Sequence, residues 1–134
     1  MPELPEVETT VRDLSRFKND YIQYVSIHTN KLRYKIPKKN ILNIKNCKIK
    51  SIYRKAKYII IELNNQFSII IHLGMSGRLK SINIKNSKKN ELHDHIKIYL
   101  RKNIITFNDP RKFGIFDFIP SKDINKSKYF KNLG

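Results

Sequence analysis

The sequence predicts a mainly β domain with flanking helices, an antiparallel β-sandwich with a helix at its N-terminus. Many short runs rich in Ile, Val, Tyr and Phe alternate with short polar turns, a pattern typical of antiparallel sandwiches and barrels. A helical pattern is found only near the two ends of the chain. The 134 residues suffice for one domain, and no internal repeat or linker divides them.

The first predicted element is a helix that begins at Pro5, a residue suited to the first helical position because it has no N–H to leave unpaired. Glu6 then lies in the first turn, where the helix dipole favours an acid. That explanation does not extend to Pro2 and Glu3, which precede the helix. The apolar face of the helix has i, i+4, i+7 spacing and consists of Val7, Val11 and Leu14.

Polar residues at 64–66 and 102–103 predict hairpin turns between neighbouring strands, and the polar segment 82–91 predicts a loop. A short terminal helix is expected at 121–133, with Ser121 as its N-cap. The strands themselves are expected at residues 21–29, 48–54, 58–63, 67–73, 78–82, 96–100, 104–107 and 115–119.

The chain is strongly basic, with 28 Lys and Arg against 11 Asp and Glu and a formal net charge of +17. Phosphate is the commonest partner of such a surface, and nucleic acid is its commonest source. The joint abundance of Lys, Asn and Ile offers a second explanation, because an A/T-biased coding sequence produces it. The charge therefore indicates a polyanionic partner but does not identify a reaction.

Several classes of protein are disfavoured. No uncharged apolar run reaches the roughly 18 residues of a membrane span, and acidic residues interrupt the start where a signal peptide would need an apolar run. Cys47 stands alone, so neither a disulfide framework nor a cysteine zinc site is expected. We expect a monomer in the reducing cytoplasm, without a membrane partner.

A proline at position two offers distinctive chemistry. Removal of Met1 would leave Pro2 with a free secondary amine, and the ordinary pKa of an α-amino group is about 8. Its unprotonated form can attack the anomeric carbon of a sugar to give an iminium ion, which promotes elimination. Glu3, the next residue, is suited to protonate the opening sugar ring.

Five segments occur in order along the chain: MPELPEVETT, RKAKYIIIEL, IIIHLGMSGRL, LHDHI and NDPRKFG. Together they resemble the amino-terminal catalytic domain of formamidopyrimidine-DNA glycosylase, a bacterial base-excision repair enzyme for oxidised purines. The resemblance covers essentially residues 1–134. The related endonuclease VIII branch usually has glycine where this chain has Leu4, so the purine-repair branch fits better.

The resemblance implies catalytic roles for four residues. Pro2 would be the Schiff-base nucleophile and Glu3 the acid that assists base loss and ring opening. Glu6 would order the site and its water. Lys57 would contact phosphate and donate a proton during strand cleavage, although a solvated basic edge is an alternative explanation for it.

The resemblance also implies DNA contacts. Met75, Arg111 and Phe113 match residues that fill the gap left by a flipped-out nucleotide, and His93 and Arg111 match DNA-contacting positions. An apolar side chain on an exposed glycine turn suits Met75 to act as a wedge between base pairs. The alternatives are a buried turn methionine at Met75 and a core aromatic ring at Phe113.

The histidines also permit a metal hypothesis. On an extended strand His93 and His95 would share a face, but zinc needs further ligands and no cysteine pair supplies them. We therefore expect phosphate contact and no metal. His72, within an apolar strand, is interpreted as a hydrogen-bonded core residue. Lys112 stands where the family often has arginine, which keeps the charge but loses bidentate geometry.

The predicted function is that of a bifunctional DNA glycosylase and abasic-site lyase that removes 8-oxoguanine and formamidopyrimidines by β,δ-elimination. Its predicted partner is double-stranded DNA with oxidised purines or abasic sites. Family members continue through a helix–two-turn–helix module and a zinc finger, which residues 1–134 do not include, so no cofactor is expected in this chain. The alternatives are a non-catalytic DNA-binding fragment, an endonuclease VIII-like domain for oxidised pyrimidines, and a basic RNA-binding domain.

Overall fold

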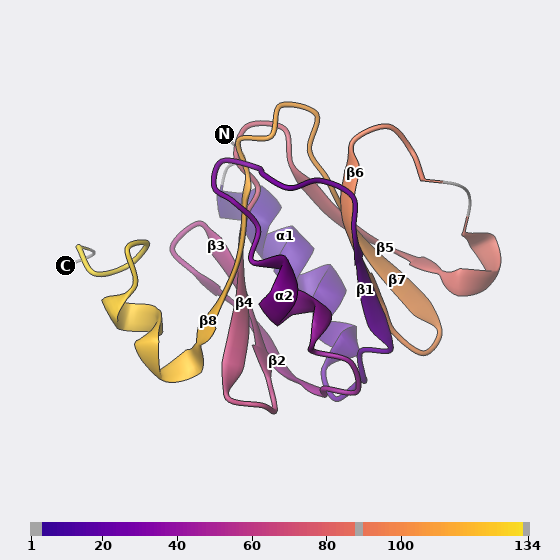
Figure 1. Ribbon diagram of the computed structural model, residues 1–134, viewed down its shortest axis with the longest axis horizontal. Coiled ribbons are helices and arrows are strands. Elements are labelled where there is room, and N and C mark those ends of the chain that lie inside the picture. Colours follow the sequence, from indigo (N-terminus) through magenta and orange to yellow (C-terminus); the bar gives the residue numbers. More distant parts are fainter. Residues whose placement is uncertain (1–3, 88–89, 133–134) are drawn as a thin grey trace.

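A computed structural model describes residues 4–87 and 90–132 as two antiparallel four-stranded sheets packed face to face (Figure 1). One sheet has the strand order β1-β6-β7-β5 and the other the order β2-β3-β4-β8. The predicted sandwich class is therefore confirmed. The strands are β1 (Tyr24–Ile27), β2 (Ile49–Lys55), β3 (Tyr58–Leu63), β4 (Phe67–His72), β5 (Arg78–Asn83), β6 (Asp94–Tyr99), β7 (Asn103–Asn108) and β8 (Ile115–Pro120).

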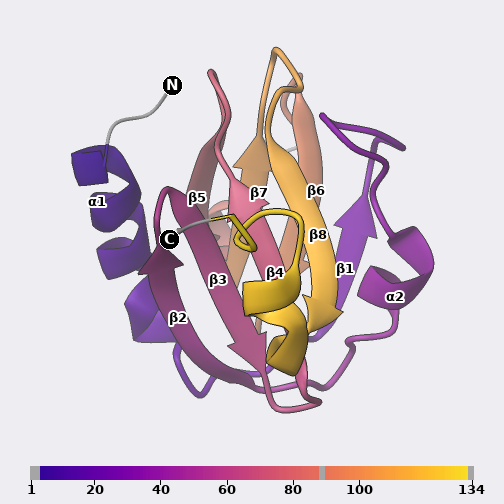
Figure 2. The ribbon, with the colours of Figure 1, turned by 90° about the vertical axis from the view of Figure 1, so that its left-hand side faces the viewer.

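Two helices lie at opposite edges of the sandwich (Figure 2). The first, α1 (Leu4–Leu14), contacts β2 and β5, the edge strands of the two sheets, and buries Val7 and Leu14. Helix α2 (Lys38–Leu42) packs against β1 and was not predicted. Neither these helices nor any other in the described part of the chain is long and apolar enough to cross a membrane.

Several expected elements differ from the structure at their ends. The strand expected at 21–29 is shorter, because Tyr21 forms only an isolated bridge to Lys48 before β1 begins. The loop expected at 82–91 instead contains the end of β5 and a 3₁₀ turn, η2 (Ile84–Asn86). The turn at 64–66 is confirmed, whereas the second turn ends earlier than expected because β7 already starts at Asn103.

The short terminal helix expected at 121–133 is found only in part, as a 3₁₀ helix, and its expected N-cap is wrong. The chain forms a six-residue 3₁₀ helix, η3 (Ser121–Lys126), which follows Pro120 without a side-chain cap. Ser121 is not an N-cap, because its N–H donates to the carbonyl of Gln66 and its hydroxyl pairs with that of Ser68 at 2.7 Å. These bonds attach the segment to the β3–β4 hairpin.

The core is made mostly of isoleucine. Ile59, Ile61, Ile69 and Ile71 are fully buried and belong to the main cluster between the sheets. The alternate residues of β3 and β4 pack on the other face against the segment that follows β8, in a cluster of Ile60, Ile70, Ile124 and Phe130. Burial on both faces explains why these two strands are continuous apolar runs rather than alternating ones.

Candidate nucleic-acid interface

Strand register brings the predicted site segments to one end of the sandwich. The last pairs at this end are Tyr58 with His72, His72 with Ile115, Arg78 with Asn108, and Asp94 with Asn108. The β2–β3, β4–β5 and β7–β8 turns and the start of β6 therefore lie together, and Figure 2 shows the β4–β5 and β7–β8 turns projecting from the same end. We call it the groove end. Five predicted residues lie on these connections: Lys57, Met75, His93, Arg111 and Phe113.

The β4–β5 turn presents Met75 to solvent. Gly74 has a φ of +63°, and a Cβ there would lie 2.7 Å from the backbone nitrogen of Gly114. Only glycine allows this turn to contact the β7–β8 connection so closely. Met75 is 50% exposed, so its alternative interpretation as a buried turn methionine is wrong.

The β7–β8 connection exposes Arg111 and Phe113 side by side. Phe113 is 46% exposed, which rules out the core interpretation of its ring. The guanidinium carbon of Arg111 lies 5.1 Å from the Phe113 ring centroid, within cation–π range. Lys112, between them, has a φ of +57°, an uncommon left-handed conformation for a non-glycine residue. The connection thus offers a cation and an aromatic face together.

Two hollows adjoin at Met75, and we call the pair the groove. They bring Glu6, from the first turn of α1, to the same surface as the three predicted gap-filling residues. Glu6 is exposed there. Besides Met75, one hollow is lined by Arg33, His72, Arg111 and Phe113, and the other by Glu6, Arg78, Asn108 and Pro110.

Arg33 is a groove residue that the sequence did not reveal. It precedes α2 in a segment without predicted structure, and its N–H donates to the carbonyl of Gly114 at 3.0 Å. Its guanidinium carbon lies 5.6 Å from the Tyr34 ring centroid. The only sequence signal for Arg33 was local, a cation beside an aromatic residue in KLRYK. Such pairs are too common to mark a residue as part of a binding site.

His72 is both a buried residue and part of the groove wall. It is 9% exposed, and its Nδ1 accepts a hydrogen bond from the N–H of Gly74 at 3.0 Å. Burial lowers the pKa of His72, and the positive charges of Arg33 and Lys57 lower it further. His72 is therefore neutral near pH 7, with its proton on Nε2. The effect on His72 also shows that the charge of half-buried Lys57 acts on this wall of the groove.

His93 lies just before β6 and has a φ of +73°, so the expectation of two histidines on one extended strand is wrong. Its carbonyl accepts a hydrogen bond from the N–H of Asp109. His95 is buried, and its Nε2 lies 2.8 Å from the carbonyl oxygen of Asp109. Within residues 4–87 and 90–132, no three His, Cys, Asp or Glu side chains are grouped closely enough to hold a metal.

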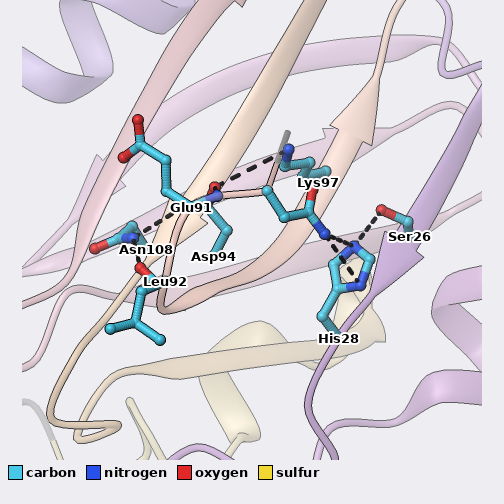
Figure 3. A network of polar contacts seen from close by, with 8 residues as sticks. Ser26, His28, Glu91, Leu92, Asp94, Lys97 and Asn108 are labelled. Carbon is cyan, nitrogen blue, oxygen red and sulfur yellow. Dashed lines mark hydrogen bonds and ion pairs between the residues drawn. The ribbon is translucent and has the colours of Figure 1, made fainter. Parts of the chain in front are cut away.

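A polar network holds Leu92 and Asp94 (Figure 3), the two residues that flank His93 in the sequence. The Asn108 amide donates to Asp94 Oδ1 at 2.8 Å and to the carbonyl of Leu92 at 3.0 Å. Asp94 Oδ2 accepts the N–H of Glu91 at 2.9 Å and lies 4.0 Å from Lys97 Nζ. Asn108 thereby joins the start of β6 to the groove that it lines.

The two residues expected to carry the central chemistry, Pro2 and Glu3, lie outside the described residues. The described residues begin at Leu4, the first residue of α1. Of the remaining predicted site residues, Glu6, Met75, Arg111 and Phe113 line the groove, and Lys57 and His93 lie on neighbouring connections at the groove end.

Comparison with known proteins identifies the family. The model of the formamidopyrimidine-DNA glycosylase N-terminal domain matches residues 1–116. The chain is 41% identical over 139 aligned residues to a Rickettsia africae formamidopyrimidine-DNA glycosylase and 40% identical over 136 to one from Zymomonas mobilis. Each alignment covers all of this chain and 49% of the relative, so the chain spans about half the length of these proteins.

A solved structure agrees. The Lactococcus lactis formamidopyrimidine-DNA glycosylase, non-covalently bound to DNA containing an abasic site, superposes with a TM-score of 0.83 at 26% identity. The match covers 93% of this chain and 48% of the other. On the evidence of the fold, the groove and these comparisons, the chain belongs to the formamidopyrimidine-DNA glycosylase family and corresponds to its N-terminal domain.

Proposed function

We propose that this chain contributes the catalytic chemistry of a bifunctional DNA glycosylase and abasic-site lyase that acts on oxidised purines. The observation that supports this most directly is the groove, which combines a carboxylate, an exposed methionine and an arginine–phenylalanine pair. The Lactococcus lactis relative has been crystallised with DNA containing an abasic site and with DNA containing a formamidopyrimidine nucleotide.

The proposed reaction begins with base flipping, because a damaged base within the stack is out of reach of catalytic groups. Removing a nucleotide leaves a gap that costs a few kcal/mol in lost stacking and pairing. Met75 and Phe113 are exposed apolar side chains suited to enter that gap, and Arg111 is suited to contact the orphaned base.

Base removal follows by nucleophilic substitution. The Pro2 amine forms a bond to C1′ while the bond from C1′ to the base breaks, and the departing base takes up the proton that the amine loses. Glu3 protonates the ring oxygen O4′ as the sugar opens. The product is an iminium ion between Pro2 and C1′. Loss of a C2′ proton then expels the 3′ phosphate, and a second elimination expels the 5′ phosphate. Hydrolysis of the iminium returns the free amine. Glu6 would order water for this final step.

The cations at the groove end support a phosphate-binding role. Three different connections each supply one cation, namely Lys57, Arg33 and Arg111. Because these connections meet at the groove end, a DNA backbone bound there could contact all three. His93 lies on a fourth connection. Phosphate contacts position DNA without reading its sequence, which suits an enzyme that must find lesions in any sequence. Lys57 would also donate a proton during strand cleavage.

Oxidised pyrimidines are a second candidate substrate class. A further structure of the Lactococcus lactis enzyme, 27% identical to this chain with a TM-score of 0.83, holds DNA containing an oxidised pyrimidine. Competition between duplexes with 8-oxoguanine and with an oxidised pyrimidine distinguishes the two classes. Preferential excision of 8-oxoguanine is expected.

Borohydride trapping tests the proposed nucleophile. Reduction in the presence of abasic-site DNA should join protein and DNA covalently, and mass spectrometry should place the bond on the amino-terminal peptide. Pro2→Gly, or retention of Met1, should abolish this product. Pro5→Ala is the matched control, since it removes the other proline of this segment and leaves the terminal amine intact. Undiminished trapping by Pro2→Gly would disprove the role of Pro2.

A further inference from the structure

A buried carboxylate lies beneath the groove. Asp109 is 0% exposed, and none of the Lys, Arg or His side chains in the described ranges forms an ion pair with it. A buried carboxylate without a cation is costly unless hydrogen-bond donors surround it. The donors that Asp109 uses therefore have to stay in place.

Those donors come from both sides of the groove. Asp109 Oδ1 accepts the hydroxyl of Ser76, in the β4–β5 turn, at 2.6 Å. Asp109 Oδ2 accepts the N–H of Gly114, at the end of the β7–β8 connection, at 2.8 Å. The Ser76 hydroxyl oxygen also accepts the N–H of Arg111 at 3.0 Å. Ser76 and Asp109 thus join the turn of Met75 to the connection of Arg111.

The main chain of Asp109 contacts a third segment, the one that carries His93 and the start of β6. Its N–H donates to the carbonyl of His93 at 3.1 Å, and its carbonyl oxygen lies 2.8 Å from Nε2 of His95. If the Met75 turn moved away, the carboxylate would lose a donor and the Arg111 N–H would lose its acceptor. Displacement of one connection is therefore penalised by the bonds of the others.

We propose that Ser76 and Asp109 are positioning residues that make Met75, Arg111 and Phe113 act as one gap-filling unit. This inference rests on the proposed function for its DNA-binding consequence, whereas the mechanical coupling depends only on the contacts just described. A coupled unit enters the gap with its side chains already ordered. Less conformational entropy is therefore lost when DNA binds. The pair should then control how strongly the protein prefers a gapped duplex to an intact one.

Two measurements on Ser76→Ala test the proposal. Hydrogen exchange should accelerate about tenfold at the amide of Gly114, which bonds to Asp109 and not to Ser76. The preference for a duplex with a tetrahydrofuran abasic analogue over an intact duplex should fall about tenfold, while affinity for the intact duplex changes less than about twofold. Ser76→Thr, which retains the hydroxyl, should restore both values.

Ser68→Ala is the matched control. Ser68 is fully buried and pairs with Ser121, so its removal deletes a buried hydroxyl far along β4 from the groove end. It should change neither measurement. Unchanged Gly114 exchange in Ser76→Ala would refute the coupling, and an unchanged abasic preference would refute its role in specificity. If the unmutated protein itself shows no abasic preference while Gly114 exchange still responds, the proposed function fails and the coupling stands.

Discussion

The core and the groove end of this sandwich differ in how far their large apolar side chains are exposed. In the core, Ile61 and Ile69 face one another in register and are fully buried. At the groove end, Met75 and Phe113 are about half exposed although they are large and apolar. The backbone differs as well, because left-handed conformations are found at four groove-end residues, Ala56, Gly74, His93 and Lys112.

This contrast indicates where in the fold a single substitution has a small effect on stability. The core is stabilised by many similar side chains, so one altered isoleucine removes only a small share of the buried surface. The groove end depends on single contacts with no substitute, such as the close approach of Gly74 to Gly114 and the hydrogen bonds of Asp109. Its exposed apolar side chains contribute little to folding, and we infer that they are retained for binding.

The largest expected effect separates chemistry from folding. Glu3→Gln should reduce excision of 8-oxoguanine about a thousandfold in single-turnover assays, because it removes the proposed proton donor. DNA affinity should be almost unchanged, since the substitution removes no positive charge. Glu8→Gln, on the exposed face of α1 beside Arg54, is the matched control and should keep full activity. Normal excision by Glu3→Gln would exclude the acid role.

The next effect tests the dependence of the groove end on single contacts. Gly114→Ala should lower the free energy of unfolding by about 3 kcal/mol, because its Cβ would lie 2.6 Å from the Phe107 ring and 2.8 Å from Asp109 Oδ2. Ile61→Val, in the core, should lower it by about 1 kcal/mol and leave DNA binding intact. Chemical denaturation of both variants gives the comparison. Equal losses would contradict the distinction between the two regions.

A smaller effect concerns binding alone. Arg111→Ala should weaken duplex affinity about tenfold and reduce the salt slope by about one unit, while stability changes by less than about 0.5 kcal/mol. Lys45→Ala, an exposed cation on the connection between α2 and β2, should have a much smaller effect on both binding measurements. A salt titration of both variants decides whether binding is local to the groove end or spread over the whole basic surface.

Much of the architecture could be predicted from the sequence, because strand periodicity and turn residues reflect local physics. The prediction failed where a tertiary contact replaced a local one. Ser121 resembles an N-cap, yet its N–H and hydroxyl bond to the β3–β4 hairpin instead. Helix α2 has only five residues and no side-chain cap, so no local sequence pattern predicts it.

The groove was predicted in part. Met75, Arg111 and Phe113 were found through family motifs, whereas Arg33 and Ser76 were not. Their importance arises from contacts that link residues far apart in the chain, Arg33 with Gly114 and Ser76 with Asp109. Periodicity carries no information on such pairs.

The smallest expected effect concerns His72, which belongs to both regions. Its pKa in the folded protein is lowered by burial and by the charges of Arg33 and Lys57, so the unfolded chain binds its proton more readily. His72 therefore contributes stability that is fully present above the unfolded pKa of about 6.5 and is lost as the pH falls towards the folded value. His72→Asn removes the titrating group, so the fall in unfolding free energy between about pH 6.5 and 5 should be shallower than in the unmutated protein. Denaturant titrations across this range measure it, and identical slopes would show that the His72 ring is not desolvated at the groove wall.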